Sequence, residues 1–297
     1  MNDSIVITGG SGFVGLRLAS LLTQKYSVYI ACKTYYDSLR HYGTFISLDV
    51  RNEKMVRQVI ADIKPVAVIH AAAITNSDYC AKFSEKAFGV NVEGTKNLAL
   101  AAEMIHARII YLSTDLIFDG GRNFYIEEDV PMPICYYGMT KYEGELIVAS
   151  ISSNYCIARL GLIFGQSVGN SSCFTQKIIE KILYNQEIQL FNDEYRTPIY
   201  LDNLCALLDE LIVRNELQGI YHLGGSERIS RYDFGVRLAQ VMGCDHSCII
   251  PSSLFDYSFI DPRPSDCSMN NRKALTVLNT KLMTIDEGLD DMIKTQR

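Results

Sequence analysis

The chain has 297 residues, 48% of them hydrophobic, and a formal net charge of −6. This length suffices for one large domain or for a main domain with a smaller lobe. The acidic balance and the lack of a Lys/Arg cluster argue against nucleic acid as a partner. The longest apolar run, 66–74, is too short to span a bilayer, and the N-terminus lacks the pattern of a secretory signal. We therefore expect a cytoplasmic protein with no membrane partner.

The nine cysteines follow no repeating spacing, which is typical of a reducing compartment. Cys244 and Cys248 lie closest together, with His246 between them. A metal site would need further ligands nearby, and no matching half-site follows in the sequence. The sequence therefore predicts no metal.

Short apolar runs alternate with helical patterns through the first half of the chain. Strands are expected at 4–8, 27–31, 45–48, 66–70, 108–112 and 155–160. Helices are expected at 16–24, 53–62, 83–105 and 137–150, with a break near Gly89. Continuous apolar strands that alternate with helices predict an α/β fold built on a Rossmann-type, doubly wound parallel sheet.

The pattern is looser after residue 160. Helices are expected at 174–184, 203–214 and 231–242, with Ser230 as an N-cap, and a short strand is expected at 219–223. We assign residues 1–160 to the main domain and 161–297 to a smaller C-terminal lobe that binds the substrate. Parts near 195–225 are expected to return to the main domain.

A glycine-rich loop joins the first strand to the first helix. Gly9, Gly12 and Gly15 form the pattern G-x-x-G-x-x-G. The first glycine permits a tight turn, the second lets the backbone approach a pyrophosphate, and the third allows close packing of helix and strand. Free N–H groups at the helix N-terminus favour an anion there. The loop predicts an NAD(P) site in residues 1–160, with Ser11, Phe13 and Val14 completing the cradle.

The second and third strands carry the signals for the adenosine half of the cofactor. An Asp or Glu at the end of the second strand would bind both ribose hydroxyls and indicate NAD. Here that position is Cys32, followed by Lys33, which can meet a 2′-phosphate. We therefore favour NADP(H) over NAD(H), with a solvated loop lysine as the alternative. Asp49 and Val50, after the third strand, are expected at the adenine.

Tyr137 and Lys141 lie one helical turn apart. A tyrosine phenol has an ordinary pKa near ~10, and a neighbouring ammonium group lowers that pKa by stabilising the phenolate. Such a tyrosine can exchange a proton with a substrate oxygen while hydride moves at a nicotinamide. The spacing Y-x-x-x-K alone occurs often by chance, and most tyrosines simply pack. The position of the pair relative to the other motifs decides its meaning.

With the glycine loop before this pair and Ser113-Thr114-Asp115 after the fifth strand, the chain resembles an extended short-chain dehydrogenase/reductase. The resemblance implies that Thr114 supplies the hydroxyl, Tyr137 the acid/base and Lys141 its support, and that Tyr137 and Lys141 also bind the cofactor. His70-Ala71-Ala72-Ala73 resembles the cofactor-lining segment of that family. Asn91, in N-V-E-G-T, matches the asparagine that braces the core and active site, and we count it among the cofactor residues.

Further segments resemble those of dTDP-4-dehydrorhamnose reductases within this family, namely 113–120, 196–204, 219–225 and Arg263-Pro264. The resemblance implies an NADP(H)-dependent reduction of the C4 ketone of a nucleotide-linked 4-keto-6-deoxy sugar. Thr114 and Thr75 would lie on the substrate side, and Arg196 and Arg263 would clamp the diphosphate. The chain has no tryptophan, although members often carry one after the sixth strand, and Arg17 replaces an acidic residue that links metal-bound dimers.

Two other functions stay open at this point. A nucleotide-sugar epimerase or dehydratase would keep the fold, although a dehydratase typically has an acid pair where this chain has Asp115 and Leu116. A non-catalytic regulatory partner, resembling the β subunit of methionine adenosyltransferase, is the second alternative. By analogy with the family we expect a homodimer formed through the 83–105 and 137–150 helices.

Overall fold

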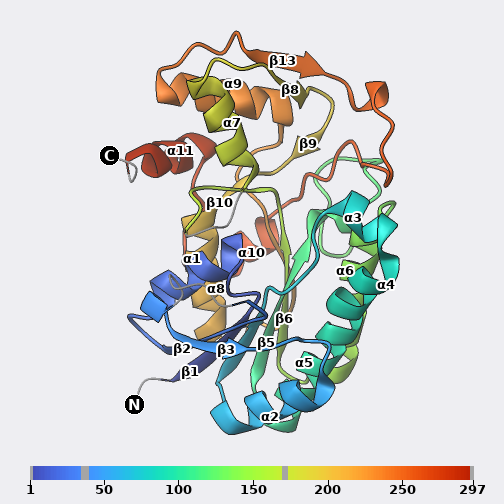
Figure 1. Cartoon of the computed structure of the whole chain (residues 1–297), viewed down its shortest axis with the longest axis vertical. Coiled ribbons are helices and arrows are strands. Elements are labelled where there is room, and N and C mark those ends of the chain that lie inside the picture. Colours follow the sequence, from blue (N-terminus) through green and yellow to red (C-terminus); the bar gives the residue numbers. More distant parts are fainter. Residues whose placement is uncertain (1–2, 35–39, 169–172, 295–297) are drawn as a thin grey trace.

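The computed structural model describes residues 3–34, 40–168 and 173–294. Its larger part is a seven-stranded parallel sheet with helices on both faces (Figure 1). The strands lie in the order β11 (Gly219–Leu223), β6 (Tyr155–Leu160), β5 (Arg108–Thr114), β4 (Ala67–His70), β1 (Ser4–Thr8), β2 (Ser27–Cys32) and β3 (Thr44–Ser47). The order reverses between β4 and β1, where open α/β sheets bind their ligands. The predicted Rossmann-type fold is confirmed.

Alternation along the strands supplies apolar side chains to both faces of the sheet. Ile5 and Ile7 face one cluster with α1 (Phe13–Leu22) and α8 (Leu201–Val213). Val6 faces the other cluster, which is covered by α2 (Glu53–Ile63), α5 (Gly94–Met104) and α6 (Tyr136–Ile151). Because successive side chains of a strand point to opposite faces, a sheet covered on both sides needs such continuous apolar runs.

The helical stretch predicted at 83–105 is interrupted where the sequence indicates. It consists of α4 (Ser84–Phe88), a π-helical turn η2 (Gly89–Glu93) and α5. Gly94, at the start of α5, lies so close to Val50 that a Cβ there would be 2.5 Å from Val50 Cγ2. The preceding helix α3 (Ser77–Lys82) was not predicted, because six residues are too few to reveal a helical period.

The smaller lobe lies above the carboxyl ends of the strands in the view of Figure 1. Its own core gathers Phe164, Phe234, Leu238 and Leu289. Its longer elements are α7 (Phe174–Leu183), β8 (Ile188–Phe191), α9 (Arg231–Met242), β13 (Ile249–Ser252) and α11 (Ile285–Lys294). Shorter ones are β7 (Ile163–Phe164), β9 (Tyr195–Arg196), β10 (Ile199–Tyr200), β12 (Ile229–Ser230) and the 3-10 turn η4 (Leu254–Asp256). Two further short elements belong to the sheet side of the molecule: the 3-10 turn η3 (Asp115–Ile117), which follows β5, and α10 (Arg272–Val277).

The two parts of the molecule are interleaved along the chain. Strand β11 pairs with β6 at the edge of the large sheet, and α8 packs against α1, although both follow residue 160. An ion pair between Arg17 and Asp202 joins these two helices. Ala274 and Leu278 also pack into the large core. The boundary at residue 160 stays a prediction. No helix within the described residues is long and apolar enough to cross a membrane.

Candidate active site

A cavity of about 680 Å³ lies between the carboxyl ends of the sheet strands and the smaller lobe. Loops after parallel strands converge here, so residues distant in sequence share one wall. The fold brings together nine of the residues expected from the sequence: Val14, Ala71, Ala73, Thr75, Thr114, Tyr137, Lys141, Arg196 and Arg263. Catalytic, cofactor and substrate candidates therefore face a common space.

The glycine loop has the geometry of a pyrophosphate cradle. Gly9 has a φ of +66°, and a Cβ there would lie 2.6 Å from the backbone nitrogen of Ala72. A Cβ on Gly15 would lie 2.5 Å from the carbonyl oxygen of Gly9. Gly12 caps α1 without a side-chain hydrogen bond, and the first turn carries no acidic residue. A compact loop that presents a helix N-terminus in this way fits the pyrophosphate of a dinucleotide.

Thr114 ends β5 with its hydroxyl already oriented. The Oγ1 hydroxyl donates to Asp115 Oδ1 at 3.2 Å and accepts from the Leu116 backbone N–H at 3.2 Å. Asp115 is buried, and its Oδ2 makes no hydrogen bond among the described residues, although it lies 3.5 Å from Arg196 Nε in an ion pair. Burial raises the pKa of Asp115, although Arg196 acts in the opposite direction. The strand end therefore presents a hydroxyl and a carboxylate oxygen to the cavity.

Helix α6 places Tyr137 beside this strand end. The Sγ of Cys135 accepts the Gly138 N–H at 3.3 Å and caps the helix. Gly138 is required because a Cβ there would collide with the carbonyl oxygen of Leu116. Burial, and after it the charge of Asp115, raises the pKa of the Tyr137 phenol. The predicted lowering of this pKa by Lys141 is wrong for the chain by itself, and Tyr137 is held in its protonated form.

Lys141 lies in an apolar pocket one turn further along α6. Its Nζ lies 3.9 Å from the centroid of the Tyr111 ring, and the residue is almost fully buried. Burial lowers the pKa of Lys141 to about 7, while the charge of Glu145, a further turn along, acts against this shift. Contact with an aromatic face compensates a buried ammonium group only in part for the hydration that it loses. Lys141 therefore titrates near neutral pH.

The lowered pKa of Lys141 predicts how stability depends on pH. Between about pH 7 and pH 10 the unfolded chain keeps this proton and the folded chain releases it, so stability increases with pH. Relative to a Lys141→Met variant, the unfolding free energy of the wild type should rise by up to about 1.4 kcal/mol per pH unit. Urea denaturation from pH 7 to 8.5 measures this slope. Lys177→Met, at an exposed lysine, is the control, and equal slopes for all three proteins would contradict the prediction.

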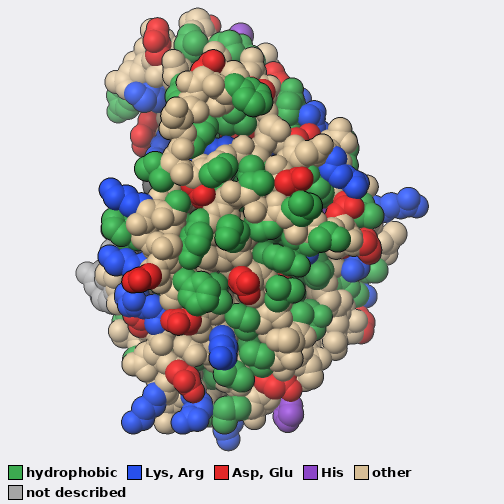
Figure 2. Space-filling model, turned by 90° about the vertical axis from the view of Figure 1, so that its right-hand side faces the viewer, with side chains coloured by type: hydrophobic (Ala, Val, Ile, Leu, Met, Phe, Trp, Pro, Cys, Tyr) green, Lys and Arg blue, Asp and Glu red, His purple; other side chains and the backbone are tan. Residues whose placement is uncertain are grey.

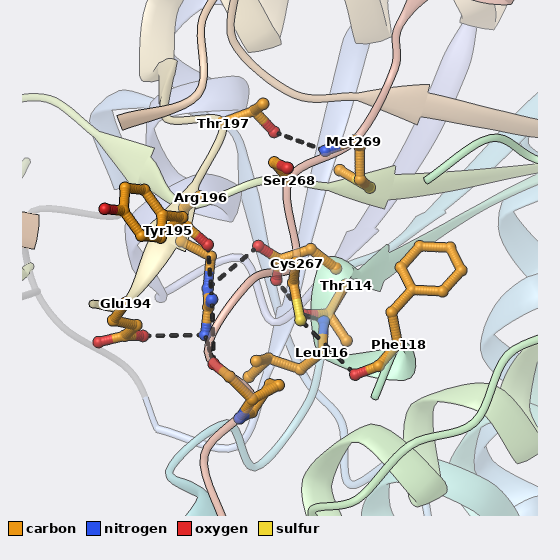
Figure 3. Close-up of polar contacts among 12 residues, drawn as sticks. Thr114, Leu116, Phe118, Glu194, Tyr195, Arg196, Thr197, Cys267, Ser268 and Met269 are labelled. Atoms are coloured by element: carbon orange, nitrogen blue, oxygen red, sulfur yellow. Dashed lines mark hydrogen bonds and ion pairs between the residues drawn. The ribbon is translucent and has the colours of Figure 1, made fainter. Parts of the chain in front are cut away.

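Arg196 does not have the geometry of a diphosphate clamp. Its buried guanidinium lies 2.9 Å from Glu194, as Figure 3 shows for this pair, and its Nε lies 3.5 Å from Asp115 Oδ2. It also donates to the carbonyl oxygens of Tyr195 and Pro264. Since these partners occupy all three of its nitrogens, the predicted clamp role is corrected. Arg196 instead ties the end of β5 to β9 and to the segment around Pro264.

Two further expectations also need correction. The Asn91 side chain is fully buried, accepts the Ile74 N–H and donates to Ile74 O and Thr140 Oγ1. It therefore acts as a brace and has no group left for a cofactor. Val50 is likewise buried in the core between sheet and helices. Its side chain therefore packs in the core, and no adenine contact is assigned to it.

The adenosine end carries a cation that sequence reasoning missed. Asp49 is held by Arg51 at 2.6 Å, and Lys33 lies 3.3 Å from the same carboxylate. The hydrogen bond from Arg51 is the main reason why the pKa of Asp49 is lowered. Both cations remain partly exposed at the ends of β2 and β3. The missed signal was the basic residue two positions after Asp49.

The smaller lobe adds Arg231, which no sequence motif indicated, to the cavity wall that also contains the expected Arg263. Arg231 lies over the Phe174 ring, with 4.9 Å to the centroid, and 3.4 Å from Glu194. Arg263 lies over the Phe259 ring at 5.3 Å and forms an ion pair with Asp78 at 3.2 Å. Lys177, Gln189 and Phe191 complete this wall. Cations stacked on aromatic rings are suited to phosphate and to a planar base.

The parallel sheet, the glycine loop and the Thr114, Tyr137 and Lys141 set define an extended short-chain dehydrogenase/reductase. Within the described residues, no group of three or more His, Cys, Asp or Glu side chains is arranged to hold a metal ion. The chain belongs to the RmlD substrate binding domain family, whose sequence profile matches residues 2–297. The resemblance stated from the motifs is thereby confirmed.

Relatives and solved structures agree with this assignment. The chain is 31% identical over 242 residues to a dTDP-4-dehydrorhamnose reductase of Aggregatibacter actinomycetemcomitans, covering 79% of this chain and 77% of the relative. It is 25% identical to methionine adenosyltransferase 2 subunit beta of Bos taurus, over 84% of this chain and 75% of that protein. The crystal structure of dTDP-4-dehydrorhamnose reductase from Bacillus anthracis, solved with NADP, matches with a TM-score of 0.88 and 28% identity, over 99% of this chain and 100% of that one.

Proposed function

We propose that the protein reduces the C4 ketone of a nucleotide-linked 4-keto-6-deoxy sugar with NADPH as the hydride donor. The observation that carries this proposal is that Thr114, Tyr137 and Lys141 share one cavity with the cations and aromatic rings of the smaller lobe. A sugar whose carbonyl is bound by Thr114 and Tyr137 would place its nucleoside diphosphate against the cations and aromatic rings of the smaller lobe. The reductases among the relatives support this substrate class.

Three side chains of the chain act on the ketone and its hydride donor, each in a different role. When bound, NADPH supplies the hydride that attacks the carbonyl carbon. The phenol of Tyr137 donates its proton to the ketone oxygen, and the raised pKa of Tyr137 keeps that proton available at neutral pH. The hydroxyl of Thr114 would turn from Asp115 Oδ1 to donate its single proton to the same ketone oxygen. Lys141 binds the nicotinamide ribose hydroxyls and, titrating near neutral pH, can return a proton to Tyr137.

Arg231 and Arg263 bind the diphosphate, since all three nitrogens of Arg196 already contact groups of the protein. Each of the two guanidinium groups contacts one carboxylate and one aromatic ring, and both arginines line the cavity. Planar guanidinium groups suit the oxygens of a diphosphate. Thr75 lines the same cavity and stays the weaker candidate for a sugar hydroxyl.

The preference for NADPH rests on Lys33 and Arg51, whose charges flank Asp49 where the 2′-phosphate would lie. An Arg51→Ala variant should raise the dissociation constant for NADPH about tenfold, because an exposed cation contributes a modest, salt-dependent attraction. Its affinity for NADH should change little. Nicotinamide fluorescence titrations measure both, with Arg57→Ala as the control. An unchanged ratio of NADPH to NADH affinity would contradict the assignment.

The function itself is tested by following NADPH oxidation with a dTDP-4-dehydro-6-deoxy sugar. We expect turnover with the nucleotide sugar and none with the free sugar. The free sugar lacks the diphosphate that Arg231 and Arg263 would bind. An epimerase would instead retain its cofactor through dialysis and interconvert sugars without consuming NADPH. No turnover with any keto-sugar nucleotide at high protein concentration would overturn the reductase and favour the regulatory role suggested by the methionine adenosyltransferase relative.

We further propose a homodimer formed through α5 and α6. Figure 2 shows hydrophobic side chains gathered over this side of the molecule, and Leu100, Met104, Met139 and Leu146 are exposed on these helices. A surface patch of this kind is typical of a subunit interface. A Met104→Glu/Leu146→Glu variant should sediment as a monomer, while the wild type and a Val213→Glu control, on α8, should sediment as dimers. A monomeric wild type would refute the proposal.

A further inference from the structure

A continuous line of buried hydrogen bonds runs from the glycine loop to the catalytic helix, and His70 is its central member. The ring Nδ1 of His70 lies 2.8 Å from Thr8 Oγ1, and the ring Nε2 lies 2.9 Å from Thr95 Oγ1. All three residues are fully buried. No step proposed above uses any of these side chains, so their arrangement needs its own explanation.

The partners fix the direction of every bond in this line. Thr95 Oγ1 donates its only proton to the carbonyl oxygen of Asn91 at 2.6 Å, so its oxygen accepts from His70 Nε2–H. In a neutral ring the His70 Nδ1 atom then carries no proton and accepts from the hydroxyl of Thr8. The oxygen of Thr8 in turn accepts the Ala72 N–H at 3.4 Å. A neutral ring satisfies all four bonds only when it is protonated at Nε2.

The surroundings also favour a neutral ring. Burial and the nearby charge of Lys141 hold the pKa of His70 well below its ordinary value. The other titratable neighbour is Tyr111, whose ring centroid lies 5.6 Å from that of His70. Burial raises the pKa of Tyr111 far above its ordinary value. Neither Lys141 nor Tyr111 offers a negative charge that would stabilise an imidazolium. The hydrogen bonds and the electrostatics thus select the same state.

Each end of the line meets one wall of the proposed site. Thr8 precedes Gly9, and its carbonyl oxygen accepts the Ala71 N–H at 3.2 Å, so this end fixes the glycine loop against the 71–73 segment. At the other end lies the π-helical turn that contains Asn91. The amide of Asn91 donates to Thr140 Oγ1 at 2.9 Å, and Thr140 is next to Lys141 on α6.

We infer that His70 is a positioning residue whose single tautomer sets the spacing between the pyrophosphate loop and the helix that carries Tyr137 and Lys141. The catalytic part of this inference rests on the function proposed above, whereas the tautomer and its effect on cofactor binding do not. π-Helical turns occur mostly as single turns within α-helices and are frequent at functional sites. Here the turn places Asn91 between the His70 line and α6.

Two substitutions separate the two ends of the line. Gln at position 70 can keep a donor near the Nε2 position, toward Thr95, whereas Asn can keep an acceptor near the Nδ1 position, toward Thr8. We expect His70→Gln to raise the NADPH dissociation constant about tenfold with a smaller change in kcat. We expect His70→Asn to lower kcat about tenfold with a smaller change in NADPH affinity. Folded variants in which both quantities change together, or neither changes, would overturn the inference.

The tautomer is tested on the wild-type protein, so a variant that fails to fold leaves the inference open to refutation. ¹⁵N NMR of the histidine rings at neutral pH should find His70 protonated at Nε2 alone. His222 is an internal control with the opposite state, because its Nδ1 donates to the carbonyl oxygen of Tyr125 at 3.1 Å and its Nε2 faces an Arg159 N–H at 3.3 Å. A proton on Nδ1 of His70 would overturn the inference. This measurement needs no sugar substrate, so it fails independently of the proposed function.

Discussion

Replacing Tyr137 with phenylalanine should lower kcat by about 10²–10⁴-fold, the range contributed by a general acid. The phenol is held in its protonated form by burial and by Asp115, so the group that is lost is the proton donor for the ketone oxygen. The ring itself stays, and with it the packing against Cys80 and Cys135. NADPH affinity should therefore change far less than kcat.

Single-turnover kinetics with NADPH and the keto-sugar nucleotide measure this effect on the chemical step. Tyr142→Phe is the matched control, because this tyrosine lies on the same helix and packs in a different cluster, with Ile117 and Phe118. The control should keep its rate. A Tyr137→Phe variant that retains most of its single-turnover rate would remove Tyr137 from the mechanism.

Replacing Arg159 with methionine should destabilise the protein by about 3–5 kcal/mol, the cost of leaving a buried charge without its partner. Arg159 on β6 meets both carboxylate oxygens of Glu145 on α6, at 2.8 Å in the closest contact, and both side chains are 2–3% exposed. Ser113 donates to the same carboxylate, and His222 borders the guanidinium. Loss of Arg159 leaves the carboxylate of Glu145, on the catalytic helix, buried without its charge partner.

Urea denaturation at neutral pH measures this loss. An Arg159→Met/Glu145→Leu double variant should recover much of the stability, because it removes both charges. Arg122→Met is the control, since Arg122 pairs with Asp129 at 2.9 Å at the surface and should cost at most about 1 kcal/mol. Equal losses in the Arg159 and Arg122 variants would show that the buried pair carries no special cost.

The sheet domain was largely predictable from the sequence because its signals are local. Apolar runs gave the strands, and the glycine pattern fell between a strand and a helix as the cofactor site requires. Tyr137 and Lys141 were found by their helical spacing. The break near Gly89 was also visible, although its form as a π-helical turn goes together with contacts of Asn91 with Thr140 and of Thr95 with His70, which lie far away in the sequence.

The smaller lobe was not predictable in the same way. Its strands β7, β9, β10 and β12 have two residues each, which is too short for a period to appear. The sequence predicted that Arg196 is a cation available to a ligand. Its partners Asp115 and Glu194 are far apart in sequence and come together only in the fold. Arg231 was missed for the same reason, since nothing near it in sequence indicates a cavity. The pKa of Tyr137 likewise depended on burial, which local spacing does not reveal.

The most direct test of the central claim follows the fate of the hydride. The protein is incubated with NADPH deuterated on the transferred face of the nicotinamide C4 and with a dTDP-4-dehydro-6-deoxy sugar. Mass spectrometry and NMR of the sugar should find one deuterium at C4, in amounts equal to the NADPH consumed. A sugar product without deuterium at C4, or no product at all from the folded protein that binds NADPH, would contradict the account.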